Sequence, residues 1–169
     1  MQAELLVLRL VHILGGILWV GSGMYSFFFL IPAISQAGPA GGQVMANLQK
    51  RRLFTVLPII AVLTILSGIR LMMIVSGGSL GTYVGTTVGR TYAISGVLAI
   101  AAFILSVVIS RPGAVRLAKL SQSAVSDKNS RDLIQSEIKA LQTRVAMSGQ
   151  IAVGLLVLSA AGMAIARYL

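Results

Sequence analysis

Four long stretches of the chain are almost purely apolar, and the polar and charged residues are concentrated between them. A helix needs roughly 20 mostly apolar residues to cross a bilayer, because the hydrocarbon core is about 30 Å thick and each residue rises about 1.5 Å. Backbone groups in lipid must be satisfied within the segment, which favours helices over open strands. The pattern therefore predicts four transmembrane helices, at about residues 5–34, 53–75, 91–110 and 148–166.

The segments between these spans differ in kind. Residues 76–90 contain five glycines, and glycine-rich segments of this type are usually irregular connections. Residues 111–147 instead have helical periodicity, because Ile134, Ile138, Leu141 and Val145 fall on one face of a helix. Residues 115–125 are also compatible with a helix, and 126–130 with a turn. We therefore expect spans three and four to extend as a helical hairpin over residues 111–147, with Pro112 as a candidate kink.

Positive charge is concentrated in two of the three connections. The first carries Lys50, Arg51 and Arg52, and the third carries seven further cations: Arg111, Arg116, Lys119, Lys128, Arg131, Lys139 and Arg144. With four spans, these connections lie on the same side, and the positive-inside rule makes that side cytoplasmic. We expect one membrane domain over residues 1–169, an all-α antiparallel bundle of four helices in the cell inner membrane. Both termini are expected outside, and the hairpin is expected in the cytoplasm.

The composition narrows the chemistry. Only 11% of the residues are charged, against about 25% in ordinary globular proteins, and the mean hydropathy is +0.90. The absence of cysteine excludes disulfides, thiolate metal sites and iron–sulfur clusters. A single histidine excludes a multi-histidine metal site within one chain, so we predict no metal site. The net charge of +10 is attributed to contact with anionic lipid headgroups rather than with nucleic acid.

The candidate binding residues lie on the first span. At about 100° per residue, one stripe of that helix collects Leu5, Arg9, His12, Gly16, Trp19 and Gly23. One interpretation is a haem or porphyrin site with the His12 imidazole as axial ligand and with Gly16, Trp19 and Arg9 around it. A second axial ligand would then come from another subunit or from a methionine (Met24, Met72, Met73 or Met163). In the alternative interpretation, His12 hydrogen-bonds a neighbouring helix and the glycines and Trp19 pack.

Two further groups of residues allow two interpretations each. Arg9, Arg70, Arg90 and Arg167 collect on the outer side against a single acid, Glu4. Such arginines either extend to the membrane interface or bind an anion or an acidic partner, for which Arg70 and Arg90 are the candidates. Small residues recur along one face of the third span, at Ser95, Ala99, Ala102 and Ser106. This stripe permits close helix packing, either within the bundle or against another subunit.

Residues 12–21, His-Ile-Leu-Gly-Gly-Ile-Leu-Trp-Val-Gly, carry a family resemblance. A histidine, six apolar or small residues and a tryptophan in a first membrane helix resemble the CopD-type copper-resistance membrane proteins, their uncharacterised bacterial relatives and the HemJ-type protoporphyrinogen oxidases. The second span, with Pro58 and Ser67-Gly68, is compatible with the same pattern. The resemblance implies a four-helix membrane unit whose His12 contacts a haem, a porphyrin or copper. It also implies a lysine in a later span for HemJ-type chemistry, and the third span has none.

These observations lead to an ordered set of hypotheses. The first is a non-catalytic accessory or scaffold subunit that packs against a larger redox, photosynthetic or transport complex or against its own copies. The second is a haem- or porphyrin-binding membrane protein or oxidoreductase that uses His12. The third is a copper or small-solute permease, against which the lack of carboxylates deep in any span argues. We do not assign an enzyme activity, and the identity of any cofactor stays open.

Overall fold

The computed structural model describes residues 2–37, 39–126 and 131–169, and its regular elements in these ranges are all helices. Four helical stretches are long and apolar enough to cross a membrane: Gln2–Gln36, Leu53–Val75, Thr87–Leu117 and Ser136–Tyr168. The all-α class and the four apolar helices predicted from the sequence are therefore confirmed. These helices are the basis for regarding the chain as a multi-pass membrane protein.

The first half of the chain contains two long helices. The elements are α1 (Gln2–Tyr25), the π-helical turn η1 (Ser26–Leu30), α2 (Ile31–Gln36), α3 (Pro39–Lys50) and α4 (Leu53–Val75). The second half contains α5 (Leu80–Gly85), α6 (Thr87–Leu105), the π-helical turn η2 (Ser106–Ser110), α7 (Arg111–Ser126), α8 (Arg131–Ile165) and the 3₁₀ turn η3 (Ala166–Tyr168). The third and fourth apolar stretches, Thr87–Leu117 and Ser136–Tyr168, are thus longer than the spans predicted at 91–110 and 148–166.

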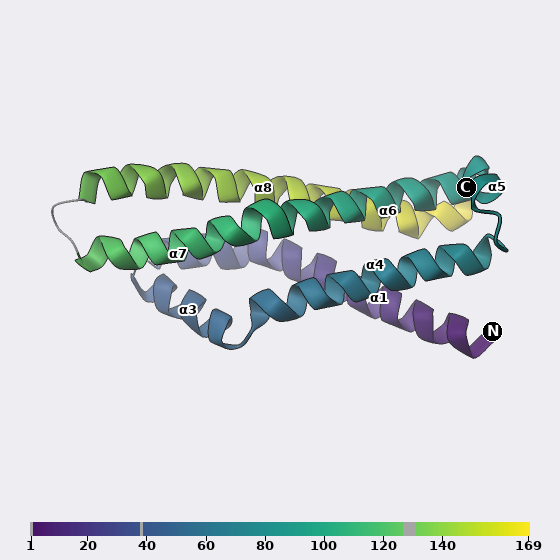
Figure 1. The fold of residues 1–169 in the computed structure, drawn as a ribbon, viewed down its shortest axis with the longest axis horizontal. Helices are drawn as coiled ribbons and strands as arrows, with labels where there is room; N and C mark the ends of the chain where they lie inside the picture. The colour runs from purple at the N-terminus through teal and green to yellow at the C-terminus, as the bar shows by residue number, and fades with distance from the viewer. Residues whose placement is uncertain (1, 38, 127–130) are drawn as a thin grey trace.

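The helices pack as two antiparallel pairs, α1 with α4 and α6 with α8 (Figure 1). Contacts between the pairs, from α1 to α8 and from α4 to α6, are sparser. Figure 1 shows both termini and α5 at one end of the molecule, and α3 and the far ends of α7 and α8 at the other. The end of α3, with Lys50, and the α7–α8 hairpin therefore lie toward the same end of the molecule.

A π-helical turn precedes a proline in each pair. The backbone N–H of Ile31 bonds to the Ser26 carbonyl, and that of Arg111 bonds to the Ser106 carbonyl, five residues back in both cases. Pro32 and Pro112 follow two residues after the end of each turn. Proline has no N–H to donate and its ring collides with the carbonyl four residues earlier, and the wider turn accommodates both effects. The helices therefore continue through both prolines.

The predicted hairpin beyond span three is present as α7 packed on the first part of α8. A side chain at Gly113 would meet Val145 Cγ2 at 2.5 Å and Leu141 Cδ1 at 3.9 Å, so the glycine lets the predicted apolar face of α8 approach α7. The Ser110 and Ser148 hydroxyls lie 3.0 Å apart at the base of the hairpin. The side chain of Ile134, and residues 127–130 of the predicted turn, lie outside what the structure describes.

The glycine-rich segment is more regular than predicted. The expectation of an irregular connection over residues 76–90 is wrong for Leu80–Gly85, which forms α5, and for the start of α6. The turn covers Ser76–Ser79, and within it Gly77 and Gly78 have positive φ values of 57° and 85°, which suit glycine. Thr86 then caps α6, because its side-chain oxygen accepts the Gly89 N–H at 3.0 Å. This cap fixes the start of α6 within the glycine-rich segment.

The α6–α8 pair is sealed by the small-residue stripe predicted on the third span. Ser95, Ala99 and Ala102 are buried, and the Ser159 hydroxyl of α8 donates to the Ser95 carbonyl at 2.7 Å. A side chain at Gly162 would overlap the Ser95 hydroxyl. Of the two interpretations offered for this stripe, the structure places it against α8. The pair is therefore held by close backbone approach, as expected between helices in lipid.

Candidate functional site

His12 lies at the contact between α1 and α4. Its Nδ1 is 2.8 Å from the backbone carbonyl oxygen of Thr64, on the facing helix. The same carbonyl accepts the Ser67 hydroxyl at 2.9 Å, and the Thr64 hydroxyl donates to the Ile60 carbonyl at 2.8 Å. The His12 Nδ1 and the two hydroxyls of α4 are thus hydrogen-bonded within the pair, and an unpaired polar group in an apolar environment would be costly.

Two glycines let the imidazole and α4 come this close. A side chain at Gly68 would lie 2.6 Å from His12 Cε1 and 3.0 Å from Nδ1, so the ring rests directly on the α4 backbone. A side chain at Gly15, three residues after the histidine, would overlap the Thr64 hydroxyl. Any larger residue at either position would separate the helices or displace the ring.

The hydrogen bond to Thr64 determines the tautomer of His12. A carbonyl oxygen can only accept, so Nδ1 carries the proton and donates it. In the neutral ring Nε2 then has a free lone pair, which is the arrangement of histidines that bind metals through Nε2 while Nδ1–H is held by a carbonyl. The geometry is therefore compatible with both interpretations of His12, as a packing residue and as a ligand.

Trp19 lies in the core where the two pairs meet. Its side chain is only 8% exposed and it packs among Ala61, Ala99, Ala102 and Leu156, which come from the other three long helices. Phe103 of α6 makes an edge contact with the indole, with centroids 6.2 Å apart and an angle of 84° between the rings. Three alanines leave the room that the indole fills. Trp19 thus joins the α1–α4 pair to the α6–α8 pair.

Of the other residues of the predicted stripe, Gly16 and Gly23 face neighbouring helices and Arg9 does not. Gly16 lies on the contact face, where a side chain would meet Thr64 Cγ2 at an ordinary 3.9 Å. Gly23 faces Leu156 and Val153 of α8. Arg9 is exposed and lies at the margin of the stripe rather than in the contact. The structure therefore gathers His12, Gly16 and Trp19 along one face and leaves Arg9 outside it.

The arginines predicted as an anion or partner site have contacts within the chain. Arg70 donates to Glu4 Oε1 through Nε at 3.0 Å and through a terminal nitrogen at 2.6 Å, which ties the C-terminal end of α4 to the N-terminal end of α1. Arg90 donates to the Gly85 carbonyl at 3.2 Å, and the Arg167 guanidinium lies 5.1 Å from the centroid of the Tyr168 ring. Each of these three arginine side chains thus contacts another residue of the chain: Glu4, Gly85 or Tyr168.

Sequence reasoning missed the α4 side of the site, namely Thr64, Ser67 and the role of Gly68. Ala61, Thr64 and Ser67 are all buried, and Gly68 continues the same face at helical spacing. A search of the second span for small and hydroxyl residues three or four apart would have found this face. The acceptor itself is a backbone carbonyl, for which a sequence has no signal.

In the part of the chain that the structure describes, no three His, Cys, Asp or Glu side chains lie together as a metal site. Comparison with known proteins gives no match to a family model, to a curated protein or to a solved structure.

Proposed function

We propose that this chain is a non-catalytic integral membrane subunit that packs laterally against other membrane-spanning helices, in a larger complex or in an assembly of its own copies. One observation carries the proposal. Gly21 and Gly154, near the middle of the first and fourth apolar helices, are both exposed, and a Cβ built at either would have no described atom of another part of the chain within 4 Å.

These two glycines differ from those inside the pairs. Gly15, Gly68 and Gly162 are explained by the atom that a side chain would strike. No contact among the described residues explains Gly21 and Gly154, and a purely lipid-facing position gives no reason to prefer glycine to a larger apolar residue. Small residues at such positions let the backbone of another membrane helix approach closely. Separately, the concentration of Lys and Arg in the first and third connections supports insertion in the inner membrane with the basic end in the cytoplasm.

The test is the retention of other protein chains after purification from the native membrane in a mild detergent. We expect the wild type to carry stoichiometric partners, or to have the mass of an oligomer. Gly154→Leu and Gly21→Leu should each reduce the retained protein at least tenfold. Val157→Leu is the matched control, because Val157 is also exposed on α8 and the change adds only one methylene. A wild-type protein that runs as a monomer without other chains would contradict the proposal.

A second candidate function, haem or porphyrin binding, is favoured by the geometry of His12. Its Nδ1 is held by the Thr64 carbonyl and its Nε2 is left with a lone pair for a metal. The absorption spectrum of the same purified sample tests this. A Soret band that is lost in His12→Ala and kept in Arg9→Gln would support it. A colourless wild type in native membranes would leave His12 as a packing residue.

A further inference from the structure

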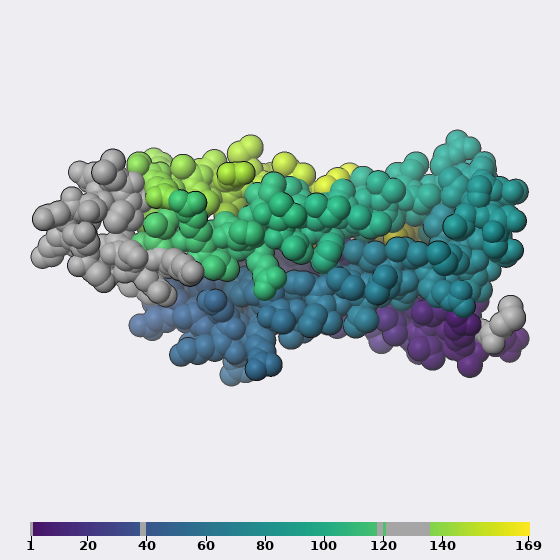
Figure 2. Space-filling view, in the orientation of Figure 1, coloured from purple at the N-terminus to yellow at the C-terminus, as the bar shows by residue number. Residues whose placement is uncertain are grey.

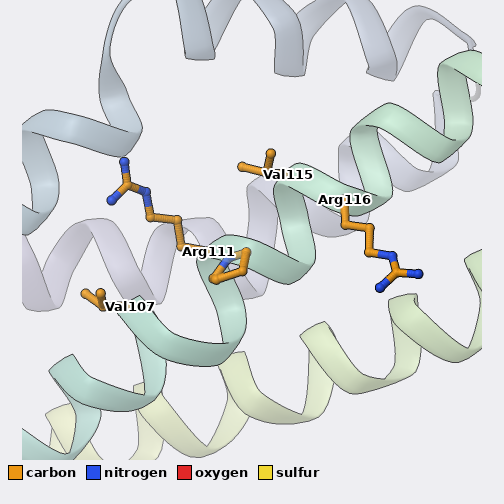
Figure 3. Close-up of a pocket in the computed structure, with 5 residues that line it drawn as sticks. Val107, Arg111, Val115 and Arg116 are labelled. Carbon is orange, nitrogen blue, oxygen red and sulfur yellow. The ribbon is translucent and has the colours of Figure 1, made fainter.

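Two shallow depressions lie on consecutive turns of the helix that runs through α6, η2 and α7. The one of about 330 Å³ is lined only by apolar side chains: Ala101, Ile104, Leu105, Val108 and Ile109. The one of about 450 Å³ is lined by Val107, Arg111, Pro112, Val115 and Arg116 (Figure 3). An apolar surface is thus followed, within two turns of one helix, by an apolar surface with two guanidinium groups.

The position of this change coincides with the expected edge of the hydrocarbon layer. Residues 91–110 contain no charged side chain, and Arg111 is the first charge after them. The π-helical turn at Ser106–Ser110 and Pro112 lie at the same level. A wide turn followed by a proline interrupts the regular side-chain ridges of a helix and leaves hollows on its surface.

The two arginines are directed differently. Arg116 points toward α8 and makes an ion pair with Glu137, whereas Arg111 extends away from α8, on the side where the ribbon of α3 and α4 lies (Figure 3). The acidic side chains that the structure describes are Glu4 and Glu137, and each is paired with another arginine, Arg70 and Arg116. Arg111 is exposed and pairs with neither of these two carboxylates.

We propose that these two depressions form a binding site for an anionic diacyl phospholipid. The lipid phosphate pairs with the Arg111 guanidinium at the membrane interface, and an acyl chain lies over Val108, Ile104 and Ala101 toward the membrane centre. The occupant is argued from charge complementarity and from the order of the surfaces, since a phospholipid has its anionic group and its apolar chains in that same order along the membrane normal. The proposal rests on membrane insertion of the proposed subunit, but not on the lateral partner.

A protein occupant fits these surfaces less well. A transmembrane helix laid over the depressions would need an acidic side chain at the one position that faces Arg111, whereas every anionic phospholipid has its phosphate at that level. The face shown in Figure 2 is formed by α3 and α4 on one side and by α6 and α7 on the other, with parts of α1 and α8 visible between them. Arg111 extends on that α3–α4 side, which carries Lys50, Arg51 and Arg52. An anion is therefore the favoured occupant.

The experiment is a titration of the full-length protein in detergent with two lipids, dioleoyl phosphatidylglycerol and dioleoyl phosphatidylcholine, with bound lipid counted by native mass spectrometry. We expect the wild type to bind the anionic lipid at least about fivefold more tightly than the zwitterionic one. Arg111→Gln should remove that preference, and Arg111→Lys should keep most of it. Arg144→Gln is the matched control, since it removes an exposed cation of α8 and should leave the preference unchanged.

Val108→Trp tests the acyl-chain part, because it fills the apolar depression and should weaken the binding of both lipids severalfold. Circular dichroism of each variant separates loss of binding from loss of fold. Equal binding of the two lipids by the wild type, or an equal loss in Arg144→Gln, would overturn the site. Displacement of the lipid by inorganic phosphate would overturn the phospholipid in favour of a free anion. Formation of a dimer that excludes lipid would overturn it in favour of a second copy. Partner retention is measured separately, so failure here leaves the proposed lateral packing intact.

Discussion

The α1–α4 pair and the α6–α8 pair solve the same packing problem with different chemistry. In both, a glycine of one helix faces a hydroxyl side chain of the other, Gly15 against Thr64 and Gly162 against Ser95. Both pairs also use a backbone carbonyl as acceptor across the contact, for His12 in one and for Ser159 in the other. Among the residues that the structure describes, only the α1–α4 pair has an imidazole at its contact and an ion pair, between Glu4 and Arg70, that joins the ends of its two helices.

The imidazole at the α1–α4 contact distinguishes it from the α6–α8 contact, which consists of packing and one interhelical hydrogen bond. The α6–α8 contact needs small residues and a hydroxyl, which suffice to hold two helices in lipid. The α1–α4 contact holds an imidazole in one orientation on a bare backbone, which packing alone does not require. The α1–α4 contact is therefore the helix contact at which a ligand role of an internal side chain can be tested.

The largest expected effect comes from removing the residue that joins the two pairs. Trp19→Ala would leave a cavity among alanines that cannot fill it, and loss of a buried aromatic residue typically costs about 3 kcal/mol or more. We expect the pairs to separate at lower denaturant, measured by circular dichroism during titration with sodium dodecyl sulfate in mixed micelles. Trp19→Phe should cost much less, and equal stability of the alanine variant would show that the pairs are joined elsewhere.

The next effect compares the two glycine–hydroxyl contacts directly. Gly15→Ala should cost about 2 kcal/mol and Gly162→Ala about 1 kcal/mol, within the usual range for overpacking. Thr64 is β-branched and its hydroxyl is bonded to the Ile60 carbonyl, whereas Ser95 is unbranched and can rotate away. The same titration measures both. Gly16→Ala is the control, because its added carbon meets Thr64 Cγ2 at an ordinary 3.9 Å. A larger cost for Gly162→Ala would reverse the comparison.

The sequence predicts the helices and their small-residue faces better than it predicts individual hydrogen bonds between helices. The four apolar helices follow from hydropathy alone, and the buried face of Ser95, Ala99 and Ala102 follows from helical spacing, so both were predicted and found. Ser106, the fourth residue of the predicted stripe, is only half-buried and bonds to the Ala102 carbonyl of its own helix. Arg9 was placed on the same stripe as His12, but spacing gives the direction of a face and not its width. The carbonyl of Thr64 has no residue signature at all, so the partner of His12 required the structure.

A double-mutant cycle tests whether the imidazole matters to the α1–α4 contact. Gly68→Ala should displace the ring and break its hydrogen bond, and His12→Ala should lose about 0.6–1 kcal/mol for that bond. In the His12→Ala background, Gly68→Ala should cost about 1 kcal/mol less than in the wild type. Simple additivity of the two changes would place the ring away from Gly68.

The smallest effect concerns the α6–α8 pair and its attached helix α5. Burial, and secondarily the nearby Tyr92, raise the pKa of Tyr83 above its ordinary value of 10.0. The folded protein therefore keeps this proton at a pH where the unfolded chain has begun to lose it, so stability should fall as the pH rises above 10. Tyr83→Phe should make that decline shallower in thermal unfolding followed between pH 9 and 11. An unchanged decline would mean that other groups control it.

The two π-helical turns have a consequence for how this sequence is aligned and engineered. Each turn is equivalent to one residue inserted into a regular α-helix, so everything beyond it is rotated by roughly 100° about the helix axis. A helical wheel drawn without a break from Thr87 to Leu117 therefore assigns Arg111 and Val115 to the wrong side. Deletion of one residue within Ser106–Ser110 would restore the regular α-helical register. The helix beyond it would then be rotated, and Gly113 would no longer face Val145 of α8. Relatives of this chain should accordingly show single-residue gaps just before these prolines.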